Sequence, residues 1–298
     1  MILSRNSYSS DDLFVDIMAY TLILFFTIIF IYPVIYTVAL SFSSPEYVNR
    51  GEVWLIPRGI NFRSYKLILE HEYIMGSFLN SVIYTSLGTL YSMILTIFGA
   101  YALAHERLRG RNFFSLLIAF TMLFSGGMIP TYLLVKDLKM LDTIWALIIP
   151  LAVSPYNMIV MRTVFQQNPS SLEESAKIDG AGYFLILFKI IIPISKPVIA
   201  TIALFYAVGK WNDFFTPLIY LNTKTKFPLQ LIARELLVTF SDQSLNRAVN
   251  AAEMSDRYNF SPMTFRAAVI FVCIFPLLII YPFVQKYFIK GVMIGAIK

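Results

Sequence analysis

The chain has 298 residues, of which 57% are hydrophobic and 14% are charged, and its mean hydropathy is +0.67. Soluble domains carry roughly a quarter charged residues, so this composition excludes an ordinary soluble protein. Several apolar runs reach about 20 residues, which is long enough to cross a bilayer core, and backbone amides there must bond within helices. We therefore predict a polytopic all-α membrane protein that forms one domain over residues 1–298.

The net charge of +6 does not indicate nucleic-acid binding. In a membrane protein, Lys and Arg collect in loops that face lipid headgroups and partner proteins. The single cysteine, Cys273, lies within an apolar run, so neither an internal disulfide nor a cysteine metal site is expected. The acidic N-terminus and the long first apolar run do not fit a cleavable signal peptide.

Six membrane helices are predicted from the apolar runs. They cover residues 17–40, 81–104, 113–135, 143–165, 197–221 and 265–288. The third contains Gly126, Gly127 and Pro130, so we expect a kink or a broken helix near one interface.

The fifth predicted helix contains charged residues. Its uninterrupted apolar part, residues 197–208, is too short to span a bilayer, so the helix is expected to continue through Lys210 and Asp213 to Tyr220. Lys210 and Asp213 are three residues apart, lie on one helix face and can pair. Ionisable groups at membrane depth usually face a cavity and have a function. The alternative is that the pair lies at the outer headgroup level and is simply solvated.

Orientation is predicted from the short segment 105–112, which carries Arg107, Arg109 and Arg111. Such a basic loop faces the cytoplasm, which places both termini and the loop at about 166–196 inside. Summed over all loops, the Lys and Arg counts are about 11 inside and about 13 outside, but long outer segments count little in this rule.

Two outer segments, at about 41–80 and 223–264, are too long for simple connections. The second has apolar residues at the spacing of an amphipathic helix, namely Leu229, Ile232, Leu236, Leu237 and Phe240. Both segments would suit the docking of an external partner. The alternative is that they pack on the membrane helices as lids.

Several catalytic patterns are absent from the sequence. It has no G-x-x-x-x-G-K-[ST] phosphate loop, no H-E-x-x-H pair and no G-x-S-x-G turn. Asp213 is the one carboxylate expected deep in the membrane, which is too few for a proton relay. We therefore expect a chain that is not itself an enzyme, and any pumping would draw its energy from another chain.

A short charged helix is predicted in the loop at 166–196. Asn168 would cap it, Pro169 would occupy its first position, and Gly180 would stop it after residues 170–178. A helix of two turns is unstable alone, so it is expected to dock into a cleft on a partner. As an alternative, Ser171 and Glu174 match a capping box, in which Glu174 would only bond an amide of its own helix.

The same loop resembles the EAA loop of ABC-importer permeases. Glu174, Ala176, Gly180, Ile190 and Pro193 fall on that pattern, while Ser175 and Ile192 are mild departures from it. Residues 120–130, the pair Trp211-Asn212, residues 281–288 and the tail at 290–298 also resemble the permease subunits of bacterial carbohydrate ABC importers. Within the maltose/oligosaccharide class, the chain resembles the subgroup that handles complex oligosaccharides.

This resemblance implies a type I importer fold, like that of the maltose permease, with six transmembrane helices in a bacterial cytoplasmic membrane. It also implies a second permease subunit, two ATPases that bind ATP and Mg, an extracytoplasmic solute-binding protein, and an oligosaccharide substrate. Relatives include importers of uronic-acid oligosaccharides, and Lys210 would suit an acidic sugar. No cofactor is expected on this chain, and nucleic acid is not an expected partner.

The resemblance also assigns residues. The coupling contacts with the ATPase would come from Glu173, Glu174, Ser175, Ala176, Asp179, Gly180 and Pro193. The tail would add contacts with the ATPase through Lys290, Gly291, Gly295 and Lys298. The candidates for the sugar path are Tyr156, Asn157, Lys210, Trp211, Asn212, Asp213 and Tyr220. Two rival functions remain: an ion-driven secondary sugar carrier and a membrane scaffold that transports nothing.

Overall fold

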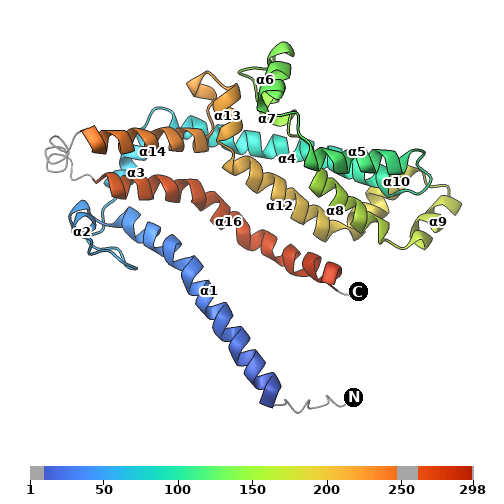
Figure 1. The fold of residues 1–298 in the computed structure, drawn as a ribbon, viewed down its shortest axis with the longest axis horizontal. Coiled ribbons are helices and arrows are strands. Elements are labelled where there is room, and N and C mark those ends of the chain that lie inside the picture. Colours follow the sequence, from blue (N-terminus) through green and yellow to red (C-terminus); the bar gives the residue numbers. More distant parts are fainter. Residues whose placement is uncertain (1–9, 247–260, 297–298) are drawn as a thin grey trace. The chain divides into compact units, whose positions relative to one another are not determined.

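The structure is a computed structural model that describes residues 10–246 and 261–296 (Figure 1). In those ranges the chain forms helices and no strands. Two compact units are present, one made of residues 1–70 with 237–272 and the other of residues 71–236 with 273–298. The single permease domain expected from the sequence stays a prediction.

Among the described residues, three helices contain an unbroken stretch that is long and apolar enough to cross a membrane. They are α1 (Ser10–Phe42), α4 (Ile74–Ala104) and α16 (Pro262–Ala296). Each contains one of the predicted spans and extends beyond it at both ends or, in α4, at its start. The first, second and sixth predicted helices are therefore confirmed.

The predicted break in the third span is confirmed. α5 (Arg111–Leu123) and α6 (Met128–Asp137) meet at an angle of 113°. Gly127 between them has φ +85°, a backbone conformation that is costly for residues with a Cβ. The two helices together are apolar enough to count as one broken span.

The fourth predicted span, over residues 143–165, is wrong as a continuous helix. It is divided into α7 (Ile144–Ile148) and α8 (Pro155–Gln166). Pro150 and Pro155 explain the interruption, because proline lacks an amide hydrogen and disfavours a helical residue before it. Ser154 then starts α8, and its hydroxyl accepts a hydrogen bond from the Asn157 amide at 3.4 Å.

The fifth predicted span is also different in the structure. α12 (Lys196–Asn212) stops before Asp213, and the separate helix α13 (Phe215–Tyr220) follows. The predicted continuation to Tyr220 is wrong because the Asp213 carboxylate accepts the amides of Phe215 and Thr216, both at 3.0 Å, and so caps α13.

α12 instead joins an apolar segment on its N-terminal side. That segment comprises α10 (Tyr183–Ile186), a π-helical turn (Leu187–Ile191) and α11 (Ile192–Ile194), and it meets α12 at 85°. Pro193 accounts for the wide turn, because a proline has no amide hydrogen for the carbonyl four residues earlier. The described residues thus contain three unbroken candidate spans, or up to five if each bent pair of helices is one span. The predicted number of six spans is therefore not confirmed.

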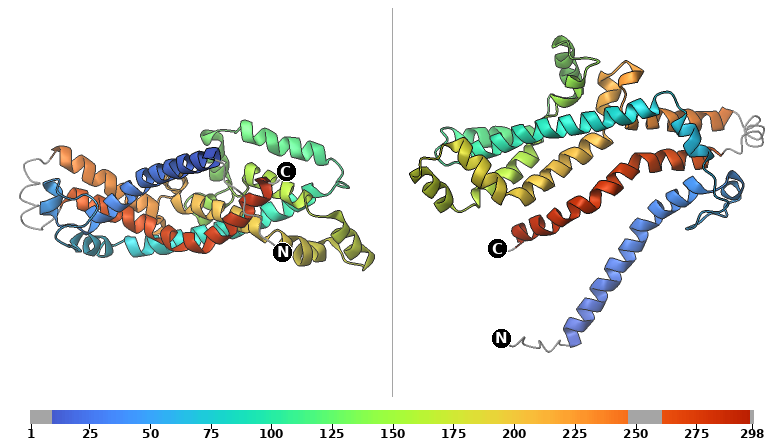
Figure 2. Two further views of the ribbon diagram at one scale, coloured as in Figure 1. Left: turned by 90° about the horizontal axis from the view of Figure 1, so that it is seen from below. Right: turned by 180° about the vertical axis from the view of Figure 1, so that it is seen from behind.

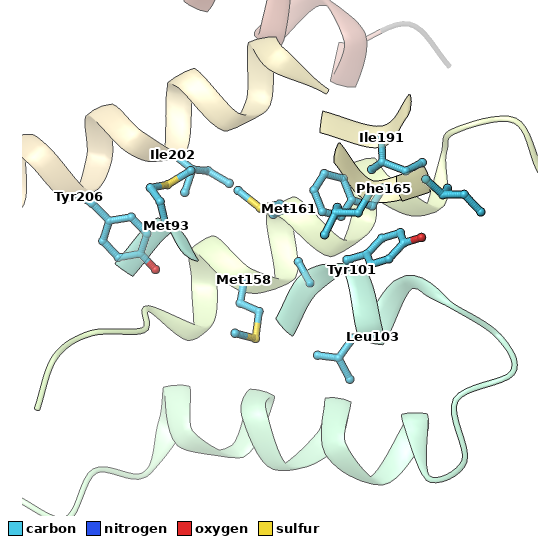
Figure 3. Packing of buried hydrophobic residues seen from close by; sticks show 12 residues of the cluster. Met93, Tyr101, Leu103, Met158, Met161, Phe165, Ile191, Ile202 and Tyr206 are labelled. Carbon is cyan, nitrogen blue, oxygen red and sulfur yellow. The ribbon is translucent and has the colours of Figure 1, made fainter. Parts of the chain in front are cut away.

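In the unit of residues 71–236, α4, α8 and α12 lie side by side (Figure 2). Their shared core contains Met93 and Tyr101 of α4, Met161 and Phe165 of α8, and Ile202 of α12 (Figure 3). Gly99 permits close packing of α4 on α8, because a Cβ there would lie 2.6 Å from the Met158 methyl carbon. This core holds together the helices that position the site described below.

In the other unit, α2 (Pro45–Asn49) and α3 (Arg63–Leu69) form part of the predicted outer segment. Val48 and Val53 are buried against Ala39 and Leu40 of α1 and against Ala267 of α16. This packing favours the lid-like alternative for this part of residues 41–80.

The predicted amphipathic helix is present as α14 (Leu229–Asn246), after a 3-10 turn (Lys224–Lys226). Leu229 and Ile232 are both buried. The rest of this segment, residues 247–260, lies outside the described residues.

Candidate functional site

The predicted coupling helix is α9 (Ser170–Ile178), within the predicted bounds. Gly180 ends it with φ +81°, and two hydrogen bonds close the end: Ala181 N–H to Ala176 O at 2.9 Å and Gly180 N–H to Lys177 O at 3.1 Å. This pair of bonds is the Schellman motif, which needs a left-handed residue and so favours glycine. The predicted role of Gly180 as the helix stop is confirmed.

The start of α9 differs from the prediction. Pro169 occupies the capping position and no side chain caps the helix, so neither Asn168 nor the alternative capping box acts there. Asn168 instead donates through its side-chain amide to the Ser195 hydroxyl at 3.3 Å. This bond ties the start of α9 to the segment that enters α12.

Most of α9 is open to its surroundings. No residue of the helix is fully buried, and Ile178 is 86% exposed. Glu174, Ser175 and Asp179 are exposed as well, whereas Ala176 packs against the core of α4, α8 and α12. An apolar side chain and a carboxylate on the open face of a short helix suit contact with another protein.

The opposite side of α9 is held by a cluster that we call the His105 cluster, made of His105, Glu173, Lys177 and Tyr183. Glu173 Oε2 lies 3.5 Å from His105 Nδ1 and 3.5 Å from Lys177 Nζ. Lys177 lies over the Tyr183 ring at 5.3 Å, and the His105 and Tyr183 rings are 5.4 Å apart. The cluster therefore joins α9 to the end of α4 and to the start of α10.

Charge in the His105 cluster is partly shielded from solvent. The side chains of His105 and Glu173 are 21% and 19% exposed. Burial lowers the pKa of His105 below its usual value, the charge of Glu173 opposes this effect, and the charge of Lys177 adds to it. His105 was not among the predicted coupling residues, because nothing in the sequence links it to Glu173, which lies 68 positions later.

The remaining predicted coupling residues lie in two places. Pro193 is exposed in α11, beyond the π-helical turn. Lys290, Gly291 and Gly295 belong to the last part of α16, and Lys298 lies outside the described residues.

A cavity of about 300 Å³ lies in the unit of residues 71–236. Its lining comes from α4, α7, α8, α12 and α13 and from the residues that join them: Ser81, Tyr84, Leu147, Leu151, Ser154, Asn157, Phe205, Tyr206, Gly209, Lys210, Asp213, Pro217 and Pro228. Three of the seven predicted path residues, Asn157, Lys210 and Asp213, are among them. A mixed lining of this kind suits a small polar ligand.

The other four predicted path residues lie elsewhere. Trp211 is buried and donates its indole N–H to the Cys273 carbonyl at 3.0 Å. Tyr220 is buried and stacks on Tyr132 at 6.2 Å. Tyr156 and Asn212 are exposed and do not line the cavity.

The expected pairing of Lys210 with Asp213 is not present. No ion pair within 4.0 Å joins them, because the Asp213 carboxylate is engaged with the amides at the start of α13. Lys210 crosses α4 at Gly88, where a Cβ would lie 2.6 Å from its Cδ and 3.1 Å from its Nζ. Gly88 thus makes the room that the lysine side chain occupies.

Asp142, in the turn between α6 and α7, bonds to the segment that follows α13. Its carboxylate accepts the amides of Asn222 and Thr223, the Thr223 hydroxyl at 2.7 Å and the Lys226 ammonium at 2.7 Å. These bonds hold the pKa of Asp142 well below its usual range. In addition, the Tyr84 hydroxyl donates to the Lys226 carbonyl at 2.9 Å, which connects this turn to the cavity wall.

The described residues form a helical membrane chain with an exposed, glycine-terminated helix and a cavity lined by both polar and apolar groups. The family model described as "Binding-protein-dependent transport system inner membrane component" matches residues 12–294, and the chain belongs to this family. Its members are transporter permease components of the inner membrane, and ATP hydrolysis in such importers belongs to a separate subunit.

Two relatives are similar to the chain over at least 90% of its length. The chain is 43% identical to the polygalacturonan/rhamnogalacturonan transport system permease protein YtcP of Bacillus subtilis (strain 168), over 95% of this chain and 98% of that protein. It is 43% identical to protein LplC of the same organism, over 90% of this chain and 89% of that protein.

A solved structure of an ABC transporter is also similar to this chain. A chain of a bacterial ABC transporter involved in the import of the acidic polysaccharide alginate matches with a TM-score of 0.84 and 38% identity, over 94% of this chain and 99% of that chain. The protein is therefore a permease subunit of an ABC importer for oligosaccharides, with relatives that handle polysaccharides of uronic acids.

Proposed function

We propose that this chain forms, with a second permease subunit, the membrane path of an importer for oligosaccharides that contain uronic acids. Two ATPases would bind ATP and Mg on the cytoplasmic side, and an extracytoplasmic binding protein would deliver the sugar. The substrate class is supported by the relatives named for polygalacturonan and alginate. The chain itself would carry no cofactor and no catalytic group.

The observation that carries the coupling role is the geometry of α9. One side of this helix is fixed to its own chain through Glu173 and Ala176, and the other side exposes Glu174 and Ile178. A helix of nine residues is too short to be stable alone, so its exposed apolar side chains favour a receiving surface on another protein. We propose that this surface belongs to the ATPase.

Movement of α9 would pass directly into the membrane helices. The His105 cluster connects the helix to the end of α4, and the bond from Asn168 to Ser195 connects it to the start of α12. Because α4 and α12 pack on each other and line the cavity, a displacement of α9 by the ATPase would reach the cavity walls. The tail residues Lys290, Gly291 and Gly295 are proposed as a second contact with the ATPase.

The proposed orientation places both termini in the cytoplasm. Contact between Glu173 and His105 supports it, because His105 begins the segment that carries Arg107, Arg109 and Arg111. Two loops in contact lie on the same side of the membrane, and a short arginine-rich loop faces the cytoplasm.

The coupling role is tested by replacing Glu174 with alanine in the assembled importer. We expect Glu174→Ala to lower both ATPase co-purification and sugar-stimulated ATP hydrolysis, while the amount of permease in the membrane stays unchanged. Glu106→Ala is the matched control, because Glu106 is an exposed carboxylate beside His105 but outside α9. If both variants bind and stimulate the ATPase like the wild type, the assignment of the Glu174 face is wrong.

A further inference from the structure

The polar groups of the cavity differ in whether their hydrogen-bonding capacity is already used. Tyr206 is engaged, because its hydroxyl bonds with Thr96 at 2.8 Å and accepts the Ser154 amide at 2.9 Å. Ser81 accepts the Leu229 amide at 2.8 Å, and the Tyr84 hydroxyl donates to a carbonyl. These groups shape the cavity, and each already makes at least one hydrogen bond within the chain.

Two lining groups have no such partner in the part of the chain that the structure describes. The Lys210 ammonium makes no hydrogen bond or ion pair there, and neither does the Asn157 side-chain amide. A lysine in a partly enclosed site of a membrane protein is costly unless an anion or water compensates it. Asp213 cannot fully compensate the charge of Lys210, because its Oδ1 already accepts hydrogen bonds from two amides of α13.

The position of Lys210 is built into the helix packing. Its aliphatic stem passes over Gly88, where any larger residue would meet Cδ at 2.6 Å and Cε at 2.9 Å. The same cavity also offers apolar surface from Phe205, which is 44% exposed. A cation, an amide and an aromatic ring together match a sugar that carries a carboxylate, hydroxyl groups and an apolar C–H face.

We propose that Lys210 binds the carboxylate of an acidic sugar residue as the oligosaccharide passes through this cavity. Asn157 bonds a hydroxyl of that residue and Phe205 packs on its C–H face. The proposal rests on the proposed function and adds to it the group that selects uronic acids within the membrane. An ammonium–carboxylate bond of this kind is charge-assisted and among the stronger hydrogen bonds in proteins.

The test is uptake of oligogalacturonate by the complete importer, reconstituted in vesicles with its binding protein and internal ATP. Lys210→Met should lower the uptake rate by about tenfold or more, the size expected for the loss of one charge-assisted bond. Lys196→Met is the matched control, because Lys196 is exposed on the same helix and does not line the cavity. Its uptake should equal that of the wild type.

A second variant moves the ammonium without removing it, and a matched control leaves the ammonium in place. Gly88→Ala introduces a Cβ that displaces the Lys210 stem and should also lower uptake, whereas Gly76→Ala on the same helix meets no atom within 4 Å and should not. Methyl-esterified oligogalacturonate provides the charge control. The loss in Lys210→Met should shrink as more carboxylates are esterified.

Normal uptake of oligogalacturonate by Lys210→Met would overturn the proposal. So would an equal loss for the acidic and the esterified sugar, since that would indicate a packing role for the side chain. A wild-type assembly that imports neither sugar would contradict the proposed function itself, which is a different result from failure of the Lys210 variant alone.

Discussion

Gly180 offers the sharpest test of how the coupling helix is built. Its φ of +81° lies in the left-handed region, and a Cβ at this position would meet no atom within 4 Å. Any cost of Gly180→Ala therefore comes from the backbone conformation and not from a clash. That cost is about 1–2 kcal/mol, which corresponds to roughly a 5- to 30-fold fall in the equilibrium constant for the native helix end.

The assay is sugar-stimulated ATP hydrolysis by the reconstituted importer, at matched amounts of permease. Because docking needs the native end of α9, Gly180→Ala should lower the stimulated rate, by at most about that 5- to 30-fold factor. Gly180→Asn is the matched control, because asparagine adopts the left-handed conformation more easily than alanine and should retain most of the activity. Equal activity of alanine variant and wild type would refute the conformational argument. An equal loss in both variants would instead indicate that the ATPase requires the absence of a side chain.

Three further predictions concern stability, measured as the apparent melting temperature in detergent. Because burial lowers the pKa of His105, the folded state favours the neutral ring, and stability should fall as the pH drops through about 6.5. The variant His105→Gln should remove this pH dependence. The control variant His71→Gln should retain it. Asp142 has a lowered pKa, so its contribution is present above about pH 4 and is lost in acid. At neutral pH, Asp142→Asn should cost about 1–2 kcal/mol, whereas Asp137→Asn, at an exposed position, should cost little. Trp211→Phe loses the bond to the Cys273 carbonyl and should cost about 1 kcal/mol; unchanged melting would contradict that role.

Local sequence patterns were sufficient for the coupling helix and for one of the breaks. Gly180 stops α9 because its backbone must be left-handed, and this preference is visible in the sequence. The break at Gly126 and Gly127 was predicted for a similar reason. In both cases the structure depends on residues that are adjacent in the chain.

The predicted helices were wrong where an apolar run also contained a residue that interrupts a helix or caps the next one. Residues 143–165 do not form the single predicted helix, because Pro150 and Pro155 lie within them and proline removes the amide that a helix needs. Lys210 and Asp213 were expected to pair at helical spacing. Asp213 instead caps a new helix, because a short carboxylate competes well for free amides.

Contacts between distant residues were beyond the reach of a single sequence. The bond between His105 and Glu173 and the passage of Lys210 over Gly88 both depend on how α4 packs against later helices. These contacts determine the two features on which the proposals depend: the anchored side of α9 and the position of the Lys210 ammonium in the cavity.

The most direct test of the account is the energy source of uptake. Vesicles that contain this permease, its partner permease, the ATPase and the binding protein would be loaded with ATP or left without it, and import of labelled oligogalacturonate would be measured with and without an ionophore. We expect import that requires internal ATP and is insensitive to the ionophore. Import without ATP that collapses with the ion gradient would contradict it and would identify an ion-driven carrier instead.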